Sequence, residues 1–127
     1  MNCNLVTLSD GYADVQIAPE WGGALTSYNY GDQAARKRIP ILRPWDGKFV
    51  DTKSVFSLAN NVLLPWCNRI GAQGFEYDQI FYPIKPNLSG EKYPIHGDGF
   101  LAAWDLTQWD ATCAELHLQS SHCPPYV

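Results

Sequence analysis

The sequence predicts an all-β fold of the sandwich type, and three observations support this prediction. Nine prolines and ten glycines interrupt the 127-residue chain every few residues, which leaves little room for helices of normal length. The aromatic content is high, with five Trp, seven Tyr and five Phe, and aromatic residues are enriched in strands. Several short runs alternate apolar and polar residues, as half-buried strands do. A chain of this length forms one domain at most.

The first thirty residues predict a hairpin followed by a third strand. Residues 5–8 and 12–17 form the two arms, and residues 9–11 form the turn, in which a glycine can take a positive φ. The next expected strand covers residues 24–30. The glycine pair at residues 22–23 just before it predicts a bulge or a close approach of two backbones.

The middle of the chain predicts one short extended run and one further hairpin. Residues 39–45 lie between prolines and are expected to be extended. Residues 54–68 are continuously apolar enough for either a buried strand or one short helical turn, and the pattern leaves both open. Residues 75–84 predict a hairpin whose tip is Asp78-Gln79.

Two more strands are expected between residues 102 and 120. Leu116 and Leu118 share one face of the second of these strands, which places His117 on the solvent face. The sequence then stops in a turn-like stretch, so the last strand is expected to have an open edge. We therefore expect the chain to be a truncated part of a larger sandwich, or its edge to be covered by another copy in a homo-oligomer.

Composition argues against several classes of partner. The formal net charge of −4 provides no basic field for nucleic acid, and the triplet at residues 36–38 is expected to be a solvated loop. No apolar stretch approaches the length of a membrane span, and the N-terminus has no signal-peptide pattern. The four cysteines show no regular spacing, which favours reduced thiols and a cytoplasmic location.

The stretch "NNVLLPWCNRIGAQGFEY" contains the first candidate site. Asn68 and Arg69 follow an apolar run directly. An arginine is almost never fully buried without a partner. The partner of Arg69 is therefore expected to be either a carboxylate of the same protein or a ligand. Cys67 next to it is expected to be a small apolar residue rather than a nucleophile.

The stretch "YPIHGDGFLAAW" contains the second candidate site. Gly97 and Gly99 flank Asp98, so the backbone can turn tightly there and expose the imidazole of His96. Histidine is the side chain best suited to proton transfer near neutral pH, but a structural role in the turn explains the pattern equally well. His122 and Cys123 lack the usual spacing of metal ligands, so no metal site is expected.

These two stretches together resemble the aldose 1-epimerases, or galactose mutarotases. The family pattern is an apolar run with P-x-x-N-R-I, then G-x-F, a hairpin with an asparagine after it, H-G with an aromatic residue, and Trp. It is met here by thirteen residues: Pro65, Asn68, Arg69, Ile70, Gly74, Phe75, Tyr82, Ile84, Asn87, His96, Gly97, Phe100 and Trp104. The segment "APEWGGALTSY" also resembles an early strand of that family. The H-G-D-G-F form departs from the more common H-G-G form, which leaves the sugar less clear.

The resemblance implies a galactose-mutarotase-like supersandwich, of which residues 1–127 would be the N-terminal part of a single domain. It implies binding of a hexose or related sugar and interconversion of its α and β anomers, with no metal or organic cofactor. In the family the arginine of N-R-I binds sugar hydroxyls and the histidine of H-G assists near the ring oxygen, roles that fall on Arg69 and His96. We add Asn68 and Asp98 as expected substrate-binding residues. The family's glutamate base and second histidine acid lie further toward the C-terminus than this sequence extends.

Two other functions remain open at this point. One is a non-catalytic sugar-binding module in which Trp21, Trp45 or Trp66 stacks on a sugar face, although core packing also explains each Trp. The other is an epimerase of a sugar phosphate, for which one arginine is few donors.

Overall fold

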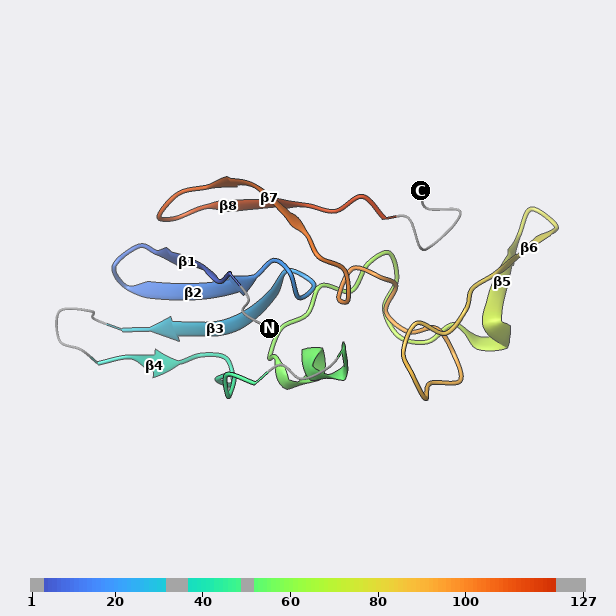
Figure 1. Cartoon of the computed structure of the whole chain (residues 1–127), viewed down its shortest axis with the longest axis horizontal. Coiled ribbons are helices and arrows are strands. Elements are labelled where there is room, and N and C mark those ends of the chain that lie inside the picture. The colour runs from blue at the N-terminus through green and yellow to red at the C-terminus, as the bar shows by residue number, and fades with distance from the viewer. Residues whose placement is uncertain (1–3, 32–36, 49–51, 121–127) are drawn as a thin grey trace.

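The computed structural model describes residues 4–31, 37–48 and 52–120, which form three antiparallel sheets (Figure 1). This confirms the all-β prediction. Within these ranges there is no α-helix, and none of the helices present is long and apolar enough to cross a membrane. The four-stranded sheet follows chain order: β1 (Val6–Ser9), β2 (Ala13–Ala18), β3 (Ala24–Tyr30) and β4 (Ile39–Pro40). Two hairpins complete the strands: β5 (Gly74–Tyr77) with β6 (Ile80–Pro83), and β7 (Asp105–Trp109) with β8 (Ala114–His117).

Two aspartates close the hairpins that lie together at one end of the molecule. The carboxylate of Asp10 accepts hydrogen bonds from the backbone N–H groups of Tyr12 and Ala13, at 2.9 and 2.7 Å. Asp110 repeats this arrangement in the β7–β8 turn. Asp and Asn side chains favour turns for this reason. The N–H of Ser9 donates to the carbonyl of Ala111 at 2.6 Å, and this bond joins the two hairpins, which lie side by side in Figure 1.

The glycine pair before β3 fulfils one of its two predicted roles. Gly22 has φ 69°, and a Cβ there would overlap the backbone of Phe100, so the chain requires a glycine at this position. The bulge lies elsewhere, between Gln16 and Ile17 in the β2–β3 register. The close approach places the 99–102 turn against the four-stranded sheet.

The basic triplet is less free than expected. Arg36 lies outside the described residues and Lys37 is exposed. The guanidinium of Arg38, however, lies 2.7 Å from the carboxylate of Asp14, which is buried in β2 and also accepts a bond from Asn29. A buried carboxylate requires such partners, and sequence spacing could not identify this pair.

Residues 54–68 contain the short helical turn that their pattern allowed, and they form no buried strand. The turn belongs to a 3₁₀-helix, η1 (Thr52–Ser57), and largely exposed extended backbone with isolated bridges follows it. These bridges join Leu25 to Asn60, Leu64 to Gly97 and Arg69 to Ile95. A second 3₁₀-helix, η2 (Gly71–Gln73), leads into β5. The segment therefore connects the four-stranded sheet to the loops that carry the candidate residues.

One hydrophobic cluster lies beneath these loops, in addition to the buried residues of the four-stranded sheet. Phe100 is completely buried and packs with Val55, Leu88 and Ile95. Phe56 contacts the Phe100 ring at 5.9 Å between centroids. Because Phe100 and Ile95 flank His96, the core fixes the position of the candidate histidine.

Candidate functional site

The two predicted motifs lie side by side. Residues 68–70 run antiparallel to residues 94–96, and the N–H of Ile70 donates to the carbonyl of Pro94 at 3.1 Å. The N–H of His96 donates to the carbonyl of Asn68 at 3.0 Å. Asn68, Arg69 and His96 thus belong to one small constellation, although 28 positions separate the first from the last.

Arg69 has a protein partner, and that partner is Glu91. The Nε and Nη2 atoms of Arg69 both donate to Oε2 of Glu91, at 3.1 and 3.0 Å. The Arg69 side chain is nevertheless 47% exposed and that of Glu91 is 33% exposed. Of the two partners that the sequence left open for Arg69, the structure contains the carboxylate. Because the pair is partly exposed, the guanidinium can still reach a ligand.

Asn68 takes a backbone conformation that few residues adopt. Its φ is 67°, in the left-handed region that asparagine tolerates better than most residues. Its side-chain Oδ1 accepts a hydrogen bond from the N–H of Arg69 at 2.9 Å. The side chain thus stabilises the local turn and orients the start of the Arg69 segment.

His96 is held by its ring as well as by its backbone. Nδ1 accepts a hydrogen bond from the N–H of Asn68 at 2.8 Å. The ring meets Phe100 edge to face, with centroids 5.6 Å apart and planes at 89°. Burial, and then the positive charge of Arg69, lower the pKa of His96 below its usual value of 6.5. The histidine is therefore neutral at physiological pH.

Asn87 holds the His96 loop in place, although the sequence gave it no role beyond the family pattern. Its Nδ2 donates to the carbonyls of Ile95 and Gly97, and its Oδ1 accepts from the N–H of Ile95 at 2.9 Å. One side chain therefore satisfies three backbone groups on either side of His96. An asparagine directly after a hairpin is the only sequence signal for this contact, and it does not identify the partner.

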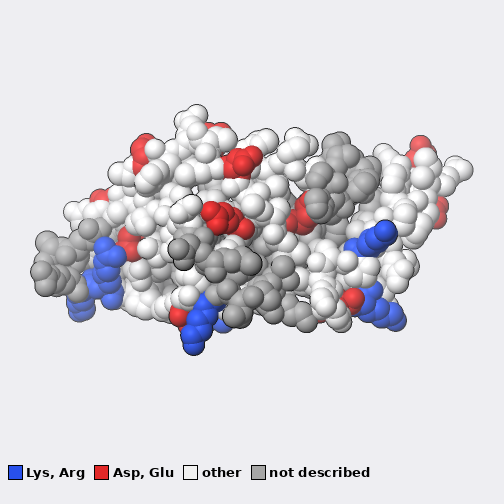
Figure 2. Space-filling view, in the orientation of Figure 1, with Lys and Arg blue, Asp and Glu red and all other residues white. Residues whose placement is uncertain are grey.

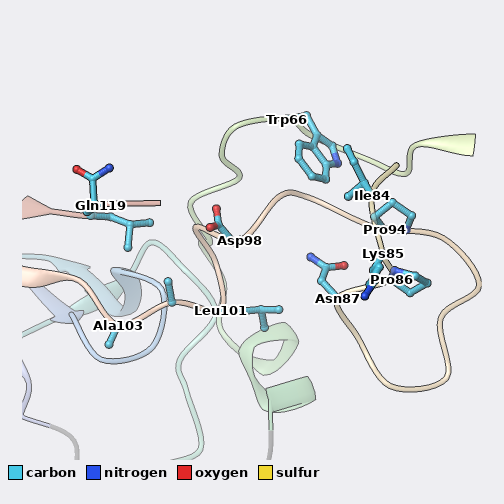
Figure 3. Close-up of a pocket in the computed structure, with 12 residues that line it drawn as sticks. Trp66, Ile84, Lys85, Pro86, Asn87, Pro94, Asp98, Leu101, Ala103 and Gln119 are labelled. Atoms are coloured by element: carbon cyan, nitrogen blue, oxygen red, sulfur yellow. The ribbon is translucent and has the colours of Figure 1, made fainter. Parts of the chain in front are cut away.

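Asp98 lines a cavity of about 610 Å³, shown in Figure 3. Its Oδ2 accepts a hydrogen bond from Ser120 at 2.7 Å, while its buried Oδ1 has no partner among the described residues. In this view Asp98 lies between Gln119 on one side and Trp66 on the other. The buried Nε1 of Trp66 also has no partner among the described residues. Buried polar atoms are usually hydrogen-bonded, so these two atoms are exceptions among the residues that line the cavity.

The cavity does not include all four predicted site residues. Asp98 lines it, together with Asn87 and Lys85, whereas Asn68, Arg69 and His96 do not. Asn87 connects the two features, because it lines the cavity and also bonds the backbone around His96.

The other candidates lie elsewhere. His117 is exposed on β8, as its strand pattern predicted, and Cys67 is a free, exposed thiol rather than a buried apolar residue. His122 and Cys123 lie outside the described residues. No group of three or more His, Cys, Asp or Glu suited to a metal ion occurs in residues 4–31, 37–48 and 52–120.

On the face in Figure 2, Lys and Arg form separate groups at the two ends and along the lower edge.

The three tryptophans weighed for stacking on a sugar differ in environment. Trp21 is buried, and its ring meets that of Trp45 edge to face at 5.2 Å. Trp45 also donates from Nε1 to the carbonyl of Lys48. Trp66 alone of the three lines the cavity. Packing therefore accounts for Trp21 and Trp45, and Trp66 is the one placed to meet a ligand.

Comparisons with known proteins give a consistent result. The family model described as aldose 1-epimerase matches residues 4–124. The uncharacterized protein YphB of Escherichia coli K12 is 29% identical over 101 residues, which is 79% of this chain and 31% of YphB. The crystal structure of a "putative aldose 1-epimerase" from Escherichia coli K12 superimposes with a TM-score of 0.79 at 22% identity, covering 96% of this chain and 38% of that one. This likeness confirms the galactose-mutarotase-like fold. The chain spans about a third of the length of both relatives.

Proposed function

The chain belongs to the aldose 1-epimerase family, and on that basis we propose that it forms part of an enzyme that interconverts the α and β anomers of a hexose. The observation that carries this proposal is the meeting of Arg69 and His96 close to a cavity whose wall contains Asp98. The full-length protein, in this proposal, is a longer chain of which residues 1–127 are the N-terminal part of one sandwich domain.

Ring opening requires two proton transfers. A base removes the proton of the anomeric hydroxyl while an acid protonates the ring oxygen, and the bond between C1 and the ring oxygen breaks. Rotation about the C1–C2 bond and closure with the roles reversed then give the other anomer. The site must therefore hold the sugar between groups that approach it from two sides.

The residues of this chain fit the binding part of that task. Arg69 is a permanently charged donor and is exposed enough to bond sugar hydroxyls while Glu91 orients it. His96 lies on the same segment pair and can bond the sugar near its ring oxygen. Asp98, Asn87 and Lys85 add polar side chains to the wall of the cavity, and Trp66 adds an aromatic one. We propose that Asn68 acts mainly through its backbone and its turn-forming side chain.

The main acid–base pair, in this proposal, lies outside these 127 residues. Glu115 and His117 are exposed on β8, and Figure 1 places that strand with the four-stranded sheet rather than near the β5–β6 hairpin. Arg69 remains protonated at working pH and cannot accept the anomeric proton. No step in ring opening requires a metal, and we propose that the enzyme uses none.

Polarimetry tests the proposal. The optical rotation of freshly dissolved α-D-glucose and α-D-galactose is followed with the full-length protein, the 127-residue chain and buffer alone. We expect the full-length protein to accelerate the change, in the presence of EDTA as well, and the 127-residue chain to give the buffer rate. A full-length protein that gives only the buffer rate with every aldose tested would contradict the proposal.

Each of the two rival functions is favoured by one observation, and each predicts a different experimental result. The placement of Trp66 in the cavity favours a sugar-binding module, which would show saturation-transfer NMR signals with a hexose but no change in rate. The placement of Lys85 there favours a sugar phosphate, which would show acceleration with glucose 6-phosphate and none with glucose.

A further inference from the structure

Both backbone polar groups of Asn68 form hydrogen bonds with His96. The carbonyl of Asn68 accepts the N–H of His96 at 3.0 Å, and the N–H of Asn68 donates to Nδ1 of the imidazole at 2.8 Å. The backbone of Asn68 therefore bonds both the backbone and the imidazole ring of His96.

The direction of the second bond determines where the imidazole proton lies. A backbone N–H can only donate, so the atom that it meets must offer a lone pair. In a neutral imidazole one nitrogen carries the proton and the other accepts. Because Nδ1 accepts from Asn68, the proton of neutral His96 lies on Nε2. If Nδ1 carried the proton, its N–H would face the N–H of Asn68, and this hydrogen bond would be lost.

The surroundings make this ring orientation persistent. His96 and Asn68 both have positive φ, at 62° and 67°, and Asn87 holds the backbone on both sides of His96. The buried Phe100 ring packs edge to face against the imidazole. A flip of the ring would lose the Nδ1 bond and leave the N–H of Asn68 unpaired.

We propose that the backbone amide of Asn68 fixes His96 as a neutral Nε2–H donor, so that His96 donates a hydrogen bond to an oxygen of the ligand and does not act as a base toward it. This inference rests on the proposed function for the identity of the ligand. Asn68 is then a positioning residue that acts through His96. The ligand must offer an acceptor oxygen to Nε2, as a pyranose ring oxygen or a hydroxyl lone pair does.

The positive charge of Arg69 acts in the same direction. Arg69, on the segment paired with His96, disfavours a second positive charge there. The carboxylate of Glu91 binds Arg69. Asp98, two residues along the same loop, bonds to Ser120. Together with burial, Arg69 lowers the pKa of His96, so the neutral donor persists into mildly acidic solution.

Nitrogen-15 NMR of the histidine rings tests the inference on the 127-residue chain itself. Two-bond ¹⁵N–¹H correlations distinguish a protonated from an unprotonated ring nitrogen, and the variant His96→Gln assigns the signals. We expect Nδ1 of His96 unprotonated, Nε2 protonated, and a titration midpoint below 6.5. His117, exposed on β8, is the internal comparison. A proton on Nδ1 of His96, or an average of both tautomers, would overturn the inference.

A pair of variants of the full-length protein tests the functional half. His96→Gln retains an N–H donor, whereas His96→Glu offers a carboxylate that could serve as a base. If His96 donates, the His96→Gln variant should retain about fivefold more kcat/KM than the His96→Glu variant, since one hydrogen bond to the sugar is worth about 1 kcal/mol. Higher activity in Glu than in Gln would contradict the donor role. The NMR result does not depend on turnover, so failure of the proposed function and failure of this inference are distinguishable.

Discussion

The guanidinium of Arg69 bonds the carboxylate of Glu91 through two of its nitrogens, at 3.1 and 3.0 Å. Both side chains remain partly exposed, so the pair orients Arg69 without removing it from solvent. An arginine held in this way is preorganised, because its side-chain entropy is already partly lost before a ligand arrives.

The first prediction concerns the energetic weight of this ion pair. Exposed pairs contribute about 0–1 kcal/mol, so Glu91→Gln should lower the free energy of unfolding of the chain by less than about 1 kcal/mol. Urea denaturation measures this, with Glu76→Gln on the exposed face of β5 as the matched control. A loss above about 2 kcal/mol would show that Arg69 is mainly structural.

The second prediction concerns Gly97. Its φ is 68°, and a Cβ there would overlap the carbonyl oxygen of Leu64. Gly97→Ala should cost at least about 1–2 kcal/mol for the left-handed backbone alone, plus the displacement of Leu64. Gly71→Ala is the control, since nothing lies within 4 Å of a Cβ there. Equal melting temperatures for the two variants would contradict the close approach.

The third prediction concerns the Asn87 clamp, by which we mean the hydrogen bonds from the Asn87 side chain to the backbone of Ile95 and Gly97. Asn87→Ala leaves backbone groups of the buried Ile95 without their partner, which should cost about 1–3 kcal/mol. Amide hydrogen exchange at Ile95 should accelerate, and the His96 ring signals should move toward those of an exposed histidine. Lys85→Ala, a change in the same cavity wall, controls for loss of side-chain volume. Unchanged exchange at Ile95 in Asn87→Ala would contradict the clamp.

The fourth prediction concerns acid stability. Hydrogen bonds from the backbone of Ala13 and Tyr12 lower the pKa of Asp10 below 3.8, and those of Thr112 and Cys113 lower the pKa of Asp110 in the same way. A carboxyl with a lowered folded-state pKa adds stability above pH 3.8 that is lost as the pH falls from 3.8 through the folded-state pKa.

Melting temperatures measured between pH 6 and pH 2, in steps of about 0.5 pH unit, test the predicted acid dependence of stability. Asp10→Asn and Asp110→Asn retain an acceptor for the turn but no titrating group, so their melting temperatures should fall less steeply in acid than that of the native chain. Glu76→Gln removes an exposed charge of β5 and serves as the comparison. Identical acid slopes in all variants would contradict the role of the two turns.

The strands were predictable from the sequence because their signals are local. Residues 24–30 form β3 as expected, and Asp78-Gln79 forms the tip of β5–β6, where both residues take positive φ. The adjacency of the Arg69 and His96 segments could also be expected, since the two motifs flank one hairpin. Local alternation and turn chemistry sufficed for these features.

The partners of the site residues could not be predicted, because they are set by tertiary packing. Glu91 lies 22 positions from Arg69 in a loop without periodicity, and nothing in its neighbourhood marks it as the partner. Asn87 reaches backbone groups 8 and 10 positions away. Asp98 lines the cavity and His96 does not. This difference depends on how the turn at Gly97 and Gly99 is folded, which the sequence pattern does not give.

The most direct test of the account is the rate of anomer interconversion by the full-length protein with Arg69→Ala. A charged donor to a sugar hydroxyl contributes about 1.5–3 kcal/mol, so kcat/KM for the preferred hexose should fall about ten- to a hundredfold. Glu91→Gln in the same protein should have a smaller effect, because the guanidinium remains. If Arg69→Ala stays folded by circular dichroism and retains the full polarimetric rate, Arg69 does not bind the sugar and the site proposed here is wrong.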